Sequence, residues 1–194
     1  MSYSKRQLWG GAITTQLPTN LIDASQFREI PDSQEVYVSK TTEDSIIFDL
    51  LEYATDPIDS KALEYHIAEL TRVNGDDESS YKLMEGKIEE FENCNIQDSK
   101  SYVAVTLQNA KKWGRDQTLL VSLFGLIRIG KVDTDLLISV YLPFKEVAEL
   151  QELQKVMDGD RDEDNLAIKK INNAKKDLIS ILSSTKVENW ELFG

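Results

Sequence analysis

Residues Thr118–Leu142 read TLLVSLFGLIRIGKVDTDLLISVYL, and this stretch decides the predicted fold. Two runs rich in β-branched and aliphatic residues, 118–129 and 135–142, flank the five residues Gly130–Thr134, whose composition is typical of a turn. This pattern predicts two strands joined as a hairpin. The run Ser101–Leu107 (SYVAVTL) predicts a strand before them, so we expect an antiparallel meander in this part of the chain.

The first half of the chain predicts further strands and one helix. The pattern of Ser45–Glu52 favours a strand, although periodicity alone does not exclude a helix there. Asp59 is a favourable N-cap residue, and apolar residues follow at helical spacing until Asn74-Gly75, which predicts a helix over Ser60–Val73. The strands expected in this half are Leu8–Thr15, Glu35–Val38, Ser45–Glu52 and Tyr81–Phe91.

The C-terminal third predicts helices. Pro143 is expected to end the sheet, and Phe144–Met157 to form a helix after it. Apolar residues between Ala167 and Leu182 recur at spacings of three and four, which is typical of an amphipathic helix that covers a sheet. The apolar tail Trp190–Phe193 is expected to dock on the body. The sequence therefore predicts an α+β fold: an antiparallel sheet of about six strands flanked by helices, with residues 1–194 in one domain.

The charge of the chain is strongly negative and unevenly distributed. The net charge is −12; residues 1–97 hold 8 basic and 19 acidic residues, whereas residues 98–194 hold 14 and 15. Such a field repels nucleic acid and anionic lipid, and it favours basic protein partners. We therefore expect neither a nucleic-acid nor a membrane partner. A simpler interpretation, in which the acidity only keeps the protein soluble, stays open at this point.

The single cysteine, Cys94, cannot form an internal disulfide, so a reducing compartment is expected. The longest apolar stretch, Leu119–Ile127, is far shorter than the ~20 residues of a transmembrane helix. The first ten residues contain no apolar run typical of a signal peptide.

The sequence contains no motif for catalysis, cofactors or metals. It has no glycine-rich phosphate-binding loop, and one Cys with one His is too few for a structural zinc site. His66, the only histidine, borders the apolar side of the predicted helix and is interpreted as structural; the alternative is a small hydrolase that uses it. The acidic run Asp158–Asp164 resembles a calcium loop but lacks the glycine and terminal Glu of an EF-hand. We expect no catalytic, cofactor-binding or metal-binding residues.

One polar segment, Phe27–Val36, points to binding instead. Pro31 stiffens the chain immediately before a predicted strand. Asp32 and Glu35 follow at a loop-to-strand junction, so both carboxylates would project from a constrained backbone, which reduces the entropy lost on binding. The alternative is an ordinary turn acid followed by a strand-edge acid.

Several segments together resemble the Mog-type family of Ran guanine-nucleotide-release factors, in particular its fungal members. The block P-D-x-Q-E-V at 31–36 is specific, whereas the hydrophobic strands alone would be a weak match, and the middle of the chain, residues 76–100, matches poorly. The matching segments, in order, are LWGGAITT at 8–15, IDAS at 22–25, REIPDSQEVYV at 28–38, SIIFDLLE at 45–52, IRI at 127–129 and DTDLLIS at 133–139.

The resemblance implies a Mog/PsbP-like fold and a regulatory protein that acts by binding, not an enzyme. It implies binding to the small GTPase Ran, promotion of guanine-nucleotide release, a role in nuclear protein import, and a location in nucleus and cytoplasm. It points to Asp32 and Glu35, with Gln34 between them, as Ran-binding residues. We further expect a monomer that needs no cofactor. The alternative within this class is a plain adaptor that binds Ran without releasing nucleotide.

Overall fold

The computed structural model describes residues 2–56, 59–75, 80–84, 86–91, 95–110, 118–159 and 161–194. Within them, a main sheet of eight strands runs in the order β3-β4-β5-β10-β9-β8-β6, with β7 also paired to β8. Every pairing in it is antiparallel, which confirms the predicted α+β class, although the sheet is larger than six strands. Its strands are β3 (Leu21–Asp23), β4 (Gln34–Ser39), β5 (Ser45–Glu52), β6 (Tyr81–Leu83), β7 (Glu89–Phe91), β8 (Lys100–Ala110), β9 (Thr118–Ile129) and β10 (Thr134–Phe144).

The predicted hairpin forms the centre of this sheet. Strands β9 and β10 pair from Ile129 opposite Thr134 to Leu119 opposite Phe144, around the short 3-10 turn η5 (Gly130–Val132). Pro143 was predicted to end the sheet, but it lies inside β10. The proline is tolerated there because β5 stops pairing with β10 at Tyr141, so Pro143 has no β5 neighbour that needs its missing N–H.

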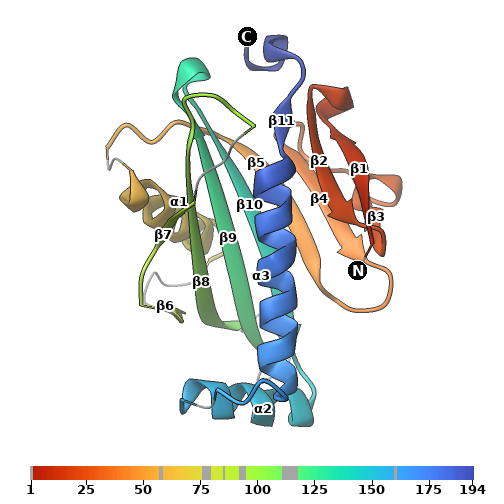
Figure 1. Cartoon of the computed structure of the whole chain (residues 1–194), viewed down its shortest axis with the longest axis vertical. Coiled ribbons are helices and arrows are strands. Elements are labelled where there is room, and N and C mark those ends of the chain that lie inside the picture. The colour runs from red at the N-terminus through yellow and green to blue at the C-terminus, as the bar shows by residue number, and fades with distance from the viewer. Residues whose placement is uncertain are drawn as a thin grey trace.

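Three α-helices in the described residues pack on the sheet. Figure 1 shows α3 (Leu166–Ser184) along one face, α1 (Ser60–Val73) against the other, and α2 (Val147–Met157) across one end. The apolar stripe of α3 packs into the larger hydrophobic core, and that of α1 into a smaller one on the opposite face. The helices predicted over 60–73 and 167–182 are confirmed. The predicted helix Phe144–Met157 begins three residues later, because Phe144 still belongs to β10.

Gly125 allows α3 to approach the sheet closely. A Cβ atom at this position of β9 would lie 3.0 Å from Cδ1 of Leu178 and 3.1 Å from both Cδ atoms of Leu182. These distances are shorter than ordinary van der Waals contacts. The missing side chain therefore sets the spacing between the helix and the central strand.

The predicted single strand Leu8–Thr15 is wrong, because the chain reverses inside it. Strand β1 (Tyr3–Leu8) and strand β2 (Ile13–Pro18) form an antiparallel hairpin, and β11 (Lys186–Val187) completes a small separate sheet. The reversal is the 3-10 turn η1 (Trp9–Gly11), in which φ is 47° at Trp9, 63° at Gly10 and 95° at Gly11. The two glycines therefore serve a turn that requires positive φ.

Two smaller predictions have different outcomes. The predicted strand Tyr81–Phe91 is two short strands, β6 and β7, which pair with successive parts of β8. The predicted docking of the tail is confirmed: Trp190–Phe193 forms a 3-10 turn, η6, packed on the larger core. Nζ of Lys131, in the β9–β10 turn, lies 4.1 Å from the centroid of the Trp190 ring and holds the tail there.

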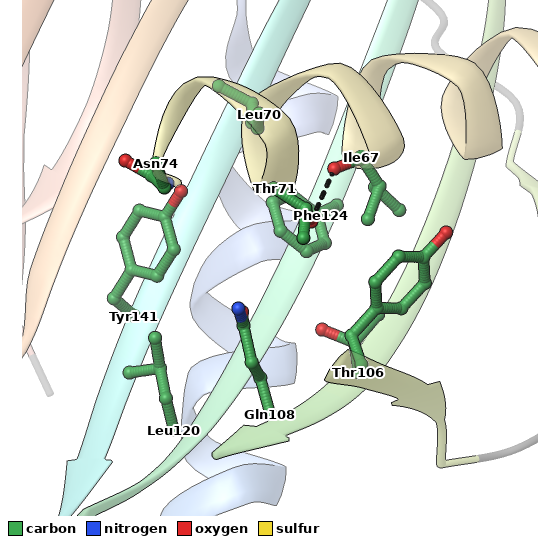
Figure 2. A pocket seen from close by; sticks show the side chains of 10 residues that line it. Ile67, Leu70, Thr71, Asn74, Thr106, Gln108, Leu120, Phe124 and Tyr141 are labelled. Atoms are coloured by element: carbon green, nitrogen blue, oxygen red, sulfur yellow. Dashed lines mark hydrogen bonds between the residues drawn. The ribbon is translucent and has the colours of Figure 1, made fainter. Parts of the chain in front are cut away.

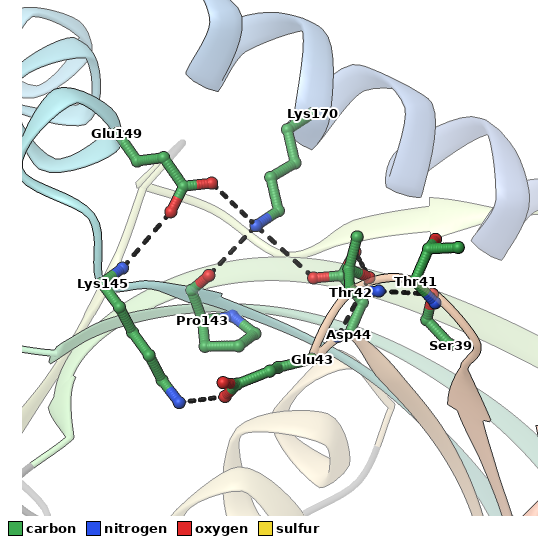
Figure 3. Close-up of polar contacts among 9 residues, drawn as sticks. All are labelled: Ser39, Thr41, Thr42, Glu43, Asp44, Pro143, Lys145, Glu149 and Lys170. Carbon is green, nitrogen blue, oxygen red and sulfur yellow. Dashed lines mark hydrogen bonds and ion pairs between the residues drawn. The ribbon is translucent and has the colours of Figure 1, made fainter.

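Lys170 of α3 connects three elements at the end of the molecule where α2 lies, as Figure 3 shows. Its Nζ donates a hydrogen bond of 3.0 Å to the carbonyl of Pro143 and lies 3.4 Å from Asp44 and 3.6 Å from Glu149. The lysine thus joins the β4–β5 loop, β10 and α2 through one partly buried charge. This end is distinct from the segment that carries the P-D-x-Q-E-V block.

Candidate functional site

Residues Asp32–Glu35, hereafter the acidic corner, form a tight turn that enters β4. The amide of Gln34 donates 2.8 Å to the carbonyl of Pro31, which closes the turn. The amide of Leu50 in β5 donates 2.9 Å to the carbonyl of Ser33, so the turn is fastened to the neighbouring strand. Asp32 is exposed at the tip of this turn. The constrained backbone expected from the sequence is therefore present.

Trp9 fastens the acidic corner from the other side. Its indole Nε1 donates 3.0 Å to the backbone carbonyl of Asp32, and its amide donates 2.5 Å to Oε1 of Glu35. Burial raises the pKa of Glu35 above its ordinary value; the bond from the Trp9 amide opposes this rise, and the nearby Asp23 carboxylate adds to it. Glu35 is thus half-buried and already holds one partner, whereas Asp32 has its carboxylate exposed.

Gln34 points to the opposite face of the sheet from Glu35, because successive side chains alternate along a strand. It stands opposite Asp49 of β5, and its Nε2 donates 2.6 Å to Oδ1 of Asp49. Burial raises the pKa of Asp49, and the bond from Gln34 only partly offsets this. The structure therefore brings the three candidate residues into one short segment but directs Gln34 and Glu35 to different sides of β4.

Trp9 and Asp49 were not predicted as part of this site. The hydrophobic surroundings of both residues predict strands, and neither residue has a partner that is near in sequence. One signal was present: Asp49 interrupts the apolar run SIIFDLLE, where a charge at a buried strand position requires a reason. The L-W-G-G turn offered a second signal, since two consecutive glycines are typical of a reversal.

His66 has the environment of a structural histidine. It is buried on α1, with Nε2 2.7 Å from Oδ2 of Asp135. The same carboxylate accepts a bond of 3.1 Å from Nε of Arg128 and one of 3.0 Å from the amide of Ala54, and Arg128 also donates to the Ala54 carbonyl. His66 is therefore one member of a buried hydrogen-bonded network that fixes α1 and the chain before it to the sheet.

A cavity of about 70 Å³ lies between α1 and the sheet, shown in Figure 2. Among the described residues that line it, His66 does not appear, so the cavity gives no support to the hydrolase alternative. One hydroxyl at its wall, that of Thr71, is engaged with the carbonyl of Ile67 at 2.8 Å. The lining comprises Ile67, Leu70, Thr71, Asn74, Tyr81, Thr106, Gln108, Leu120, Phe124 and Tyr141.

The remaining sequence predictions concern metals and membranes. Within the described ranges, no group of three His, Cys, Asp or Glu residues is arranged to hold a metal ion. In the acidic run 158–164, Asp164 is exposed and pairs with Lys169 at 2.8 Å, while residue 160 lies outside the described residues.

Cys94 and the acidic residues 76–78 also lie outside the described residues. In the part of the chain that the structure describes, no helix combines the length and apolar character needed to cross a membrane.

Comparison with known proteins gives matches over most of the chain. Residues 6–143 match the family model described as Ran-interacting Mog1 protein. The chain is 34% identical over 157 residues to the nuclear import protein MOG1 of Saccharomyces cerevisiae. This alignment covers 74% of this chain and 67% of that protein. It is 41% identical over 69 residues to the Ran guanine nucleotide release factor of Danio rerio, covering 36% and 38%.

A solved structure matches the whole fold. The crystal structure of the Saccharomyces cerevisiae Ran-binding protein Mog1p superposes with a TM-score of 0.80 at 26% identity and covers 100% of both chains. The family match at 6–143 includes the acidic corner, Trp9, Asp49 and the central hairpin. The helices α2 and α3 lie outside it, and the whole-chain superposition includes them.

Proposed function

Since the chain belongs to the family of Ran-interacting Mog1 proteins, we propose that Asp32, Glu35 and Gln34 form its contact surface for Ran. As a member of this family, the protein binds the small GTPase Ran, promotes release of its guanine nucleotide and takes part in nuclear protein import. The observation that carries the site assignment is the acidic corner: an exposed carboxylate, Asp32, on a turn fastened to both β5 and Trp9.

The proposed action requires differential binding and no covalent chemistry. A partner that binds nucleotide-free Ran more tightly than loaded Ran weakens the nucleotide by the same factor, because the two binding equilibria are linked. A partner with equal affinity for both forms would release nothing. The protein thus acts as a regulator through binding energy, and the acidic corner supplies the contacts that distinguish the two forms.

The charge of the acidic corner suits the parts of a GTPase that hold nucleotide. GTPases hold the phosphates with a lysine and Mg²⁺, so a carboxylate can compete with phosphate for that lysine or hold a switch loop away from the metal. The net charge of −11 in residues 1–97 assists encounter with a basic surface. Because the corner is held at Trp9 and Leu50 before binding, little conformational entropy is lost on docking.

The test is release of labelled nucleotide from Ran by a variant that carries Asp32→Ala and Glu35→Gln. The glutamine removes the charge but keeps an acceptor for the Trp9 amide, so the fold should be retained. Loss of a desolvated interfacial charge costs about 2–5 kcal/mol, so Kd for Ran should rise about 30-fold or more. Glu146→Ala, an exposed acid just before α2, is the matched control and should release nucleotide like the wild type.

Two results would change the proposal in different ways. Release by the double variant at the wild-type rate would remove the site assignment while leaving the family function intact. Equal affinity of the wild-type protein for loaded and nucleotide-free Ran would make it an adaptor instead of a release factor. Equilibrium titration of both forms of Ran separates these cases.

We further propose that residues 1–194 work as one monomeric domain in the nucleus and cytoplasm, with no nucleic-acid or membrane partner. The acidic composition supports the absence of nucleic-acid and membrane partners, and the single cysteine supports a reducing compartment. Light scattering at micromolar concentration tests the oligomeric state, and a dimer mass would contradict it.

A further inference from the structure

Asp49 is a buried carboxylate without a cation. Its residue exposure is 5%, and within the described part of the chain its one hydrogen-bond partner is Gln34. Burial raises its pKa, so the loss of hydration outweighs the one bond that it receives. A carboxylate in this condition costs folding free energy, and groups with perturbed pKa values cluster at functional sites.

The sheet face around Asp49 is only partly covered by α1. Within the described residues, helix α1 packs mainly over β8 and β9 (Figure 1), and Leu51 is the one residue of β5 that packs against the core beneath this helix. The side chains beside Asp49 on β5, Ile47 and Leu51, are therefore only partly buried. On the opposite face of the same strand, Ile46 and Phe48 are fully packed in the larger core. Asp49, itself almost fully buried, thus lies between two partly exposed apolar neighbours.

This surface is continuous with the acidic corner. Gln34, which holds Asp49, lies between Asp32 and Glu35 in sequence, and the Leu50 amide next to Asp49 binds the carbonyl of Ser33. A partner docked on Asp32 would therefore meet Gln34 and Asp49 next, on the side of β4 opposite to Glu35.

We propose that the Ran contact surface extends from Asp32 across Gln34 to Asp49, whose carboxylate accepts a lysine or arginine side chain of Ran. This inference rests on the proposed function. A cation paired with Asp49 would offset the hydration that the carboxylate lost on burial. Gln34 holds the carboxylate in place to receive that cation. Ile47 and Leu51 provide apolar surface for the aliphatic stem of such a side chain.

Asp49→Asn gives the sharpest test, because it is nearly isosteric and removes only the charge. If Asp49 serves binding, the variant unfolds at the wild-type temperature or above it, while its Kd for Ran rises about tenfold or more. A purely structural role predicts the reverse, a lower unfolding temperature with unchanged Kd. Asp177→Asn is the matched control, since Asp177 on α3 is also a desolvated carboxylate with one side-chain donor, Tyr3 at 2.5 Å. It should leave Ran binding unchanged.

A second variant keeps the test decisive if Asp49→Asn folds poorly. Ile47→Lys places a cation on the same face, two residues from Asp49, where it would occupy the carboxylate and repel a basic partner. It should fold and lose Ran binding. If Asp49→Asn and Ile47→Lys both bind Ran with the wild-type Kd while Asp32→Ala binds more weakly, this inference is overturned and the proposed function stands. A wild-type protein that fails to bind Ran would overturn the proposed function itself.

Discussion

The indole Nε1 of Trp9 donates a 3.0 Å hydrogen bond to the backbone carbonyl of Asp32, which links the small sheet to the acidic corner. The two residues are 23 positions apart in sequence, and Trp9 reaches Asp32 only because the chain reverses at Trp9–Gly11. The turn after β1 therefore positions the segment that carries the proposed Ran contacts.

Trp9→Phe should loosen the acidic corner without removing any acid. The phenyl ring keeps most of the apolar contact but lacks the N–H donor, so stability should fall by about 1 kcal/mol and Ran affinity should fall with it. Chemical denaturation and titration with Ran measure the two effects. Trp190→Phe, at another tryptophan that packs on the larger core, is the control and should keep wild-type affinity.

Phe27→Ala should weaken Ran binding with little effect on the fold. Phe27 begins the segment that leads to the acidic corner and is 60% exposed, which is unusual for a large aromatic side chain. Exposed aromatic residues often provide the main binding energy of an interface, so Kd should rise about tenfold while the unfolding temperature stays within a few degrees. Val147→Ala, at the first residue of α2 and also mostly exposed, should change neither quantity.

Asp135→Asn should strongly destabilise the protein. The change leaves the buried Arg128 guanidinium without its counter-charge and weakens the contacts to His66 and Ala54. Removing one partner of a buried ion pair typically costs about 3–5 kcal/mol. Urea denaturation measures the loss, with the nearby exposed Asp133→Asn as control. A change below 1 kcal/mol for Asp135→Asn would show that the network does not hold α1.

Gly125→Ala should destabilise the protein by overpacking. The added methyl group would meet Leu178 and Leu182 at 3.0–3.1 Å, so α3 or its leucines must shift, at a cost of about 1–3 kcal/mol. Gly130→Ala is a suitable control, because its Cβ would lie 3.7 Å from the Tyr53 hydroxyl. Equal stability of the two variants would contradict this account of the α3 contact.

The stability gained by Asp49→Asn should depend on pH. Because burial raises the pKa of Asp49 in the folded state, the native protein binds this proton more tightly than the unfolded chain does. The contribution of Asp49 to the free energy of unfolding is favourable below its unfolded pKa of about 3.9, and this contribution is lost as pH rises through its pKa in the folded state. The advantage of the Asn variant should therefore be largest near neutral pH and disappear in acid, which denaturation at several pH values measures. Gln34 donates a hydrogen bond to Asp49, and the Asp49 charge contributes to raising the pKa of Tyr141 to about 12, which is far above the pH range of this test.

The features that sequence predicted best depend on long, regular patterns. The apolar runs of β9 and β10 and the three-and-four spacing on α3 specify element type over many residues. The reversal at Trp9 was missed because its flanking strands are short and the hydrophobic run continues through it. The pair Gln34–Asp49 could not be predicted because cross-strand register depends on how β4 and β5 align, which local sequence does not specify.

The short pairing of β3 has a consequence for solubility. Strand β3 pairs only with Tyr37–Ser39, so the first half of β4, which carries Gln34 and Glu35, lies beyond the reach of β3. The 3-10 turn η2 (Ala24–Gln26) contacts β4 without belonging to the sheet, and an unpaired strand edge invites a second molecule to add its own strand and begin aggregation. Asp32 and Glu35 place like charges beside this edge, and two molecules that met there would repel each other. The same carboxylates that attract a cationic partner would thereby discourage self-assembly.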